Sequence, residues 1–490
     1  MAAIVQPSEN DGKLDNAWSI CGLPGSRYAL LLIAVVAQAL TIGITWPLWQ
    51  VRISPVHMPA IDLPQIPFGV WMLATLVLVI VRPRLGLAVH AASLLLSFVF
   101  DQYRTQPQVI AMVMLMFAVV EDCGVVLVRW FLASLWLWAG LHKLLSPDWF
   151  TFASWYMVKS LHVNPENFQR LFAYGVGLGE LAVGLLAIFR PRWAAIPCAM
   201  MHVGITLFLT PLFYDHNISV MPWNLATAII GGWVMWNAPS VVPRFRWEWG
   251  LAGLLLIYPA GFYAGWVDHG IASVLYSHHL PEAMITTKTS NYKITGWGDL
   301  EVPFPNERRL FKLYFERAAK PGSKLHISEP RPWLGDMYFV LDADGKSVEI
   351  SREQFVQQSP NQAEGVEVDS RRIRFLLARK GVALMRREKG GVIYAIEIPP
   401  KRYRPELLEM LRGLPNLEQI NLSGCEVTDE DLTRLPRLPK LVGIGLSDTP
   451  VTNASIDTLL KQPRLTFIEY AQSNITLDAM VEFEQKRPVD

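Results

Sequence analysis

The sequence has few cysteines, and they lie far apart. The four cysteines form no C-x-x-C pair, and only Cys425 lies after residue 270. This pattern predicts neither a zinc site nor a disulfide framework, and we expect no bound metal. The chain also lacks an excess of one charge, since its net charge is +1 over 490 residues. A basic surface for nucleic acid is therefore not expected.

Charged residues are scarce in the first part of the chain. Between Tyr28 and Val267, 21 of 240 residues are charged, whereas 61 of the last 223 are charged. A water-soluble domain with so few charges would expose a very large apolar surface. A lipid bilayer removes this difficulty, because apolar side chains can face hydrocarbon there. The sequence therefore predicts a polytopic α-helical membrane bundle followed by a soluble region.

Changes in composition divide the chain into four predicted parts. The first apolar run is too long for a cleaved signal peptide, so we interpret it as a signal anchor. The predicted parts are a polar N-terminal segment at 1–27, a transmembrane domain at 28–270, a mixed α/β soluble region at 283–390 and leucine-rich repeats at 391–490.

The transmembrane domain is predicted to have about nine spans, because a span needs roughly 20 mostly apolar residues. The runs at 66–81 and 107–121 are short, so re-entrant segments are an alternative for these two. The predicted spans are 28–50, 66–81, 85–101, 107–121, 125–145, 170–189, 193–213, 218–237 and 248–267.

Arginine pairs in short loops indicate the orientation, because positively charged short loops tend to stay in the cytoplasm. With a cytoplasmic N-terminus, three such pairs fall on the cytoplasmic side. An odd number of spans then places the C-terminal region outside the cytoplasm, and one span more or fewer would reverse that. The pairs are Arg82/Arg84, Arg190/Arg192 and Arg244/Arg246.

The C-terminal region contains an internal repeat with a step of 24 residues. Its pattern, L-x-x-L-x-L-x-x-(C/T/S)-x-V, resembles a leucine-rich repeat, in which each unit adds a short strand to a shared core. Cys425, Thr449 and Ser473 occupy the position where a small polar side chain bonds loop backbone. A short curved sheet of this kind is a plausible docking surface for a protein or peptide. The recurring residues begin Leu417, Ile420, Leu422, then Leu441, Ile444, Leu446, then Leu465, Ile468, Tyr470.

Before the repeats, Asp342-Ala343-Asp344-Gly345 separates two predicted strands. The spacing favours the turn of a β-hairpin. It also resembles the start of a calcium loop, but the later acidic ligands are missing at the required spacing. Lys389-Gly390-Gly391 predicts a second hairpin in the same way.

Ionisable residues inside predicted spans are candidates for function. Lys143 lies near the end of its span beside His142, where apolar surroundings would favour a neutral amine able to act as a base. The alternative is an interfacial anchor that reaches the headgroups. Glu180 lies in a glycine-rich span and needs a partner, for which Lys143, Arg129 or His202 are candidates. Trp223 and Asn224 start another span, where they line a ligand mouth or cap the helix.

One short run resembles a known family. Ala139-Gly140-Leu141-His142-Lys143-Leu144, followed by Asp148-Trp149, is similar to the A-G-x-x-K-L…D-W motif of the vitamin K-dependent gamma-carboxylase family. The membrane domain of that family is also called the horizontally transferred transmembrane (HTTM) domain. The similarity extends to Glu180 and to Met201-His202. DoxX-type membrane proteins share a similar signature.

The resemblance implies a specific chemistry. Lys143 would be the base that deprotonates reduced vitamin K or another quinol, and His142 falls on the neighbouring position. His202, Glu180, Arg129, Trp223 and Asn224 would line the substrate or quinone pocket. The enzyme would be carboxylase-like, a carbon–carbon lyase. The leucine-rich repeats depart from the family, because they do not match its soluble region.

Three hypotheses follow from these observations. The first is a carboxylase-like enzyme that uses a quinol, and the second is a DoxX-like, redox-associated membrane subunit. The third is a non-enzymatic membrane anchor that displays a leucine-rich-repeat docking surface. All three make the lipid bilayer a partner, and none names a substrate.

Overall fold

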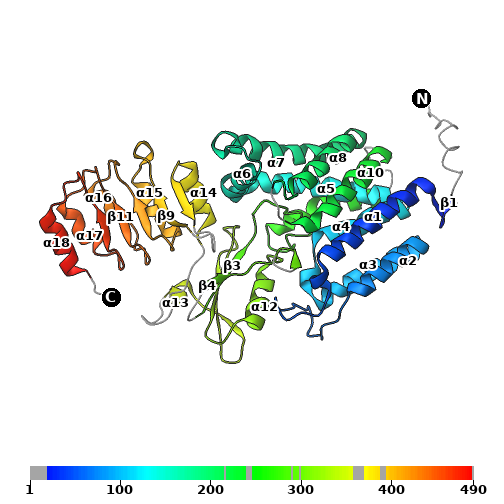
Figure 1. The fold of residues 1–490 in the computed structure, drawn as a ribbon, viewed down its shortest axis with the longest axis horizontal. Coiled ribbons are helices and arrows are strands. Elements are labelled where there is room, and N and C mark those ends of the chain that lie inside the picture. Colours follow the sequence, from blue (N-terminus) through cyan, green and yellow to red (C-terminus); the bar gives the residue numbers. More distant parts are fainter. Residues whose placement is uncertain are drawn as a thin grey trace. The chain divides into compact units, whose positions relative to one another are not determined.

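The computed structural model describes most of the chain and divides it into two compact units (Figure 1). The described residues are 19–213, 217–238, 246–287, 291–296, 300–356, 369–386 and 393–487. The first unit comprises Met1–Ser146, Ala153–His278 and Thr295–Leu310, and the second comprises Pro147–Phe152, His279–Ile294 and Phe311–Asp490.

The first unit is built from helices, most of which consist mainly of apolar residues. A small β1–β2 ribbon, Ser19–Ile20 with Leu23–Pro24, precedes them. The helices are α1 Gly25–Ile44, α2 Gly69–Val81, α3 Pro83–Phe100, α4 Pro107–Val120, α5 Gly124–Leu145, α6 Ser154–Ser160, α7 Pro165–Phe189, α8 Pro191–Phe208, α9 Met221–Ala226, α10 Gly232–Asn237 and α11 Arg246–Ile257. A π-helical turn, Thr227–Gly231, joins α9 to α10, and short 3-10 turns lie at Trp46–Trp49, Gln102–Arg104, Ile218–Val220 and Tyr258–Phe262.

Five helical segments among the described residues are long and apolar enough to cross a membrane. They are Gly25–Ile44, Pro83–Phe100, Gly124–Leu145, Phe168–Phe189 and Ile218–Asn237. Helices α2 and α4 are apolar but shorter. The last predicted span is mostly not helical, because α11 ends at Ile257, shortly before Pro259. The count of nine crossings therefore stays a prediction.

Helices α5 and α7 approach each other closely because glycines lie at their contact. A Cβ atom on Gly140 would lie 2.5 Å from the backbone nitrogen of Leu181, and one on Gly184 would lie 2.6 Å from that of Leu137. Any larger side chain at either position would overlap backbone. The glycine-rich span thus serves the close helix packing that its composition predicts.

Ion pairs join the ends of several helices on one side of the bundle. Arg27 at the start of α1 lies 2.6 Å from Asp122, just before α5. Arg84 at the start of α3 lies 3.0 Å from Glu121, which follows α4. These contacts place two starts and one end of consecutive helices together. The side of the membrane that they face stays a prediction.

The second unit contains an antiparallel sheet of order β4-β3-β5-β6-β7. Its strands are β3 Glu282–Thr286, β4 Asn291–Lys293, β5 Lys324–Ser328, β6 Met337–Leu341 and β7 Ser347–Glu349, with helices α12 Arg308–Ala318 and α13 Arg352–Val356 along the same part of the sequence. The β6–β7 hairpin confirms the predicted turn, in which Asp342 Oδ1 accepts hydrogen bonds from the backbone of Asp344 and Lys346. Within the described ranges no group of His, Cys, Asp and Glu could hold a metal ion.

A second sheet has the order β12-β11-β10-β9-β8, and β9 to β12 run parallel. Figure 1 shows these strands stacked along the repeated region. Ile396, Ile420, Ile444 and Ile468 pair across them, so the sequence step of 24 residues appears as strand register. The strands are β8 Ala383–Arg386, β9 Ile393–Glu397, β10 Gln419–Asn421, β11 Gly443–Gly445 and β12 Phe467–Glu469, and the helices are α14 Arg371–Arg379, α15 Glu406–Met410, α16 Asp429–Leu432, α17 Ile456–Leu459 and α18 Leu477–Lys486.

Small polar side chains bond loop backbone in this sheet as the repeat predicts. Cys425 Sγ is 3.3 Å from the carbonyl oxygen of Ile398, and the hydroxyls of Thr449 and Ser473 each donate to a carbonyl 2.7 Å away. β8 and β9 pair antiparallel, as predicted for the second hairpin. Its turn, residues 389–391, lies outside the described residues.

Candidate functional site

Lys143 lies in the last turn of α5 and is buried against α7. Its Nζ donates to Glu180 Oε1 at 3.0 Å, to Glu180 Oε2 at 2.7 Å and to the carbonyl oxygen of Leu275 at 3.0 Å. The Lys143 and Glu180 side chains are 4% and 11% exposed. An ammonium group has three donors and no acceptor, and these contacts use all three. This geometry favours a buried ion pair over a neutral base or an interfacial anchor.

His142 bonds the segment that follows α11. Its Nε2 lies 3.0 Å from the carbonyl oxygen of Ala272, and its Nδ1 lies 2.9 Å from the Tyr263 hydroxyl. A carbonyl oxygen only accepts, so Nε2 carries a hydrogen. The ring is therefore oriented by backbone on one side and by a phenol on the other.

His142 belongs to a row of donors on α5, which we call the α5 donor row: Ser134, Trp138, His142 and Ser146. Residues four apart lie on one face of a helix. Each member bonds a backbone carbonyl of the chain between residues 255 and 277: Leu255 at 2.5 Å, Leu256 at 2.8 Å, Ala272 at 3.0 Å and Ser277 at 2.6 Å, in that order. The row, with Lys143 beside it, thus fixes the end of α11 and the segment after it.

His202 forms a second buried polar group. Its Nε2 accepts from Trp136 Nε1 at 2.9 Å, and its Nδ1 lies 2.7 Å from Asn224 Oδ1. An indole nitrogen only donates, so Nε2 is the acceptor and Nδ1 is the donor to the amide oxygen. The ring of Trp223 lies 6.2 Å from the His202 ring. The indole N–H of Trp223 is buried and has no partner among the described residues.

Arg129 lies apart from both groups. Its Nε and Nη2 donate to the carbonyl oxygens of Ala187 and Ile188, at 3.2 and 2.9 Å. These are among the last carbonyls of α7, which have no partner within the helix. Arg129 precedes Lys143 by four turns of α5, about 21 Å at 1.5 Å per residue. The structure thus brings Glu180 to Lys143, gathers Trp223 and Asn224 at His202, and places Arg129 elsewhere. Quinol binding at these residues stays a prediction.

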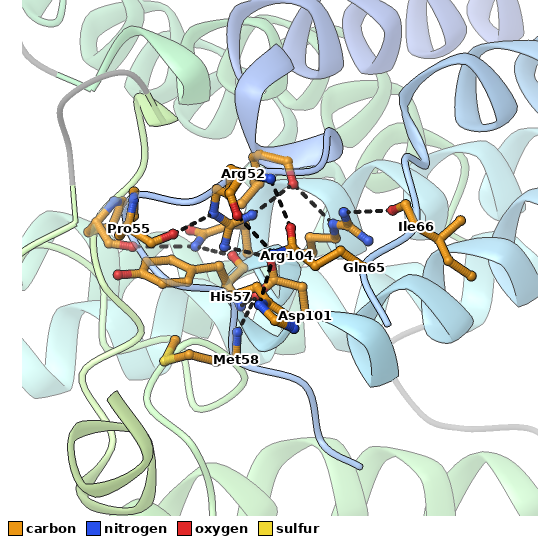
Figure 2. Close-up of polar contacts among 12 residues, drawn as sticks. Arg52, Pro55, His57, Met58, Gln65, Ile66, Asp101 and Arg104 are labelled. Carbon is orange, nitrogen blue, oxygen red and sulfur yellow. Dashed lines mark hydrogen bonds and ion pairs between the residues drawn. The ribbon is translucent and has the colours of Figure 1, made fainter. Parts of the chain in front are cut away.

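A buried charged cluster escaped the sequence reasoning, which treated its members as loop charges. Figure 2 shows Arg52, Asp101 and Arg104 in contact. Arg52 Nη2 lies 2.5 Å from Asp101 Oδ2, and Asp101 Oδ1 accepts from the backbone nitrogen of Met58 at 3.1 Å. Arg104 Nε donates to the carbonyl oxygen of Leu48 at 3.0 Å. The cluster ties the loop between α1 and α2 to the end of α3.

The charges of this cluster do not balance, since two arginines share one carboxylate. Burial lowers the pKa of Arg104 to about 10, the positive charge of Arg52 lowers it further, and Asp101 acts in the opposite direction. One signal for the cluster was available in the sequence. Charged residues are so rare before residue 267 that each one needs a partner or an exit to water.

The comparison with known families finds one match. Residues 121–217 match the family described as methylamine utilisation protein MauE. The stretch is about a fifth of the chain and contains Lys143, Glu180 and His202. No curated protein and no solved structure matches the chain. The match and the apolar helices together identify an integral, multi-pass membrane protein.

The match also corrects a prediction, because it falls on the segment that carries the A-G-x-x-K-L motif. The predicted resemblance to the vitamin K-dependent gamma-carboxylase (HTTM) family, or to DoxX, was wrong. The physical reason lies in the roles of the motif residues. Gly140 permits backbone contact with α7, and Lys143 pairs with Glu180. Two helices in close contact can require such residues without any shared chemistry.

Proposed function

We propose that this protein is a membrane-anchored interaction protein, in which the helical bundle holds the chain in the bilayer and the repeated region binds a partner protein. The observation that carries the proposal is the outward surface of the parallel sheet. We call it the open face: Gln419, Asn421, Gly443, Gly445, Phe467 and Glu469. It alternates along each strand with the buried isoleucines of the core.

The open face combines an exposed aromatic residue with a region of small side chains. Phe467 is 61% exposed, although it lies on a strand that pairs with glycine-containing β11. Gly443 is its register neighbour, so no side chain stands beside the ring on that strand. Exposed aromatic side chains with polar neighbours are frequent anchors of protein interfaces. The acidic side chain of Glu469 lies on the same strand.

Two further observations support a leucine-rich-repeat solenoid as the scaffold of this face. Each parallel strand steps by 24 residues, and each turn uses the same small polar position, at Cys425, Thr449 and Ser473. Stacked units of this kind form extended concave surfaces that bind other proteins.

The hydrogen bonds of α5 favour an anchoring role for the bundle over catalysis. Lys143 already donates to Glu180 and Leu275, so a base at Nζ would first have to break a buried ion pair. The α5 donor row holds the chain that leads toward the soluble region. The MauE match supports the membrane role, and we take no substrate from it.

Site-specific photo-crosslinking in cells tests the proposal. We would place p-benzoylphenylalanine at Phe467 and, as a matched control, at Leu477, which is 70% exposed and lies in α18 outside the open face. We expect a discrete crosslinked product from Phe467 and none of that size from Leu477. A second experiment places the crosslinker at Gln419 and adds Phe467→Ala, which should abolish the product. Identical products from Phe467 and Leu477 would contradict the proposal.

A further inference from the structure

The second unit contains a pocket with a volume of about 330 Å³. It is bordered by β5, β6 and the turn between them, by the start of α13, by the start of α14 and by residues 412–415. Its volume lies at the lower end of the range that small-molecule sites occupy. None of the residues discussed in the helical unit takes part in it.

The acidic side chains of this pocket are already engaged by the protein. Glu329 forms a two-pronged ion pair with Arg331, at 2.6 and 2.9 Å, and both side chains are almost completely buried. Asp336 Oδ2 lies 3.1 Å from His326 Nε2, and Asp336 Oδ1 accepts from the backbone nitrogen of Glu329 at 2.9 Å. These contacts leave little negative charge to face the pocket.

Three arginines line the pocket from three separate segments. Arg352 begins α13, Arg372 lies in the first turn of α14, and Arg412 precedes the loop at 413–415. Arg372 and Arg412 pair with no carboxylate in the part of the chain that the structure describes. The segments thus bring positive charges together at one cavity, where an anion would relieve their mutual repulsion.

The remaining walls are apolar or aromatic. Pro330, Pro332 and Pro415 line the pocket together with Tyr338, whose ring stacks on His326 at a centroid distance of 4.6 Å. Such walls suit the carbon skeleton of an organic molecule better than a hydrated inorganic ion. Guanidinium groups bind carboxylates and phosphates through paired hydrogen bonds.

We propose that this pocket binds a small organic anion whose carboxylate or phosphate group contacts Arg372 and Arg412. The inference is independent of the proposed partner binding, because no residue of the open face lines the pocket. The two possible groups share the chemistry that the arginines recognise. Separate probes can therefore distinguish them.

Isothermal titration of the purified full-length protein in detergent tests the proposal. The probes are citrate as a carboxylate and glycerol phosphate as a phosphate, each at constant ionic strength. We expect saturable binding of at least one probe, and the probe that binds identifies the group. Arg372→Gln and Arg412→Gln should each weaken binding about tenfold or more, the loss expected for a charge-assisted hydrogen bond.

Arg464→Gln is the matched control, because Arg464 is an exposed arginine of the repeats outside the pocket. It should leave the affinity unchanged. Thermal unfolding without ligand should be the same for all three variants and the wild type, which separates loss of binding from loss of folding. If neither probe binds, or if Arg464→Gln weakens binding as much as Arg372→Gln, the proposal is overturned.

Discussion

The buried ion pair between Lys143 and Glu180 allows a quantitative test of how α5 and α7 are held together. Their closest atoms are 2.7 Å apart, and both side chains are almost fully covered. Removing one partner of a buried pair leaves an uncompensated charge, which typically costs about 3–5 kcal/mol. We expect Lys143→Met and Glu180→Met each to lower the free energy of unfolding by an amount in this range.

The double variant should be far less unstable than the sum of the two single variants. Two methionines replace the ion pair with apolar groups of similar length, an exchange that is often close to neutral. The coupling between the substitutions should therefore reach at least about 2 kcal/mol. Unfolding in mixed micelles of mild detergent and dodecyl sulfate, followed by tryptophan fluorescence, measures each free energy.

Arg27 and Asp122 provide the matched control for this cycle. Their closest atoms are 2.6 Å apart, but the Asp122 side chain is 91% exposed, so water screens the pair. We expect the corresponding cycle with Ala to give less than about 1 kcal/mol of coupling. Additive losses at Lys143 and Glu180, or a coupling no larger than that of the exposed pair, would refute the reasoning.

Three other predictions concern packing, cysteine reactivity and pH. Gly140→Ala should destabilise the protein by about 1–3 kcal/mol, because its Cβ would meet backbone, whereas Gly179→Ala should not, because the space there is open; thermal unfolding compares the two. A maleimide at pH 8 should label the exposed Cys21 and Cys123 but not the buried Cys198 and Cys425, and burial raises the pKa of the Cys425 thiol to about 11; mass spectrometry before and after denaturation counts the labels, and four labels on the folded protein would contradict this. Burial, with Glu307 adding to it and Arg309 opposing it, raises the pKa of Asp268 above 3.8, so its ionisation costs stability as the pH rises from the unfolded pKa through the folded one; Asp268→Asn should remove that loss, and equal pH profiles for the two proteins would contradict it.

The parts of the fold that follow from local spacing could be predicted from the sequence. The membrane region was visible because few charges occur before residue 267, and lipid tolerates few. The parallel strands were visible because Leu417, Leu441 and Leu465 recur at the same step in which Ile420 and Ile444 pair in the structure. In both cases the physical constraint acts on neighbouring residues, so a single sequence records it.

The partners of the buried ionisable groups could not be predicted in this way. The sequence offered three partners for Glu180, and the choice depends on which helices touch, which is decided by glycines on both α5 and α7. Arg52 and Arg104 were read as loop charges that indicate orientation. In the structure both point inward, because the carbonyl oxygen of Leu48 lacks a helical partner and accepts from both.

The α5 donor row explains why this segment looked catalytic. Backbone that leaves a helix within a membrane bundle exposes carbonyl oxygens that cannot reach water, so side chains must donate to them. The side chains able to do so, Ser, His, Lys and Trp, include those that enzymes use as bases and nucleophiles. Catalysis would require only His142 and Lys143, whereas support of the backbone also requires Ser134 and Trp138, two turns or more away. The regular step of four along α5 therefore favours structural support as the reason for these residues.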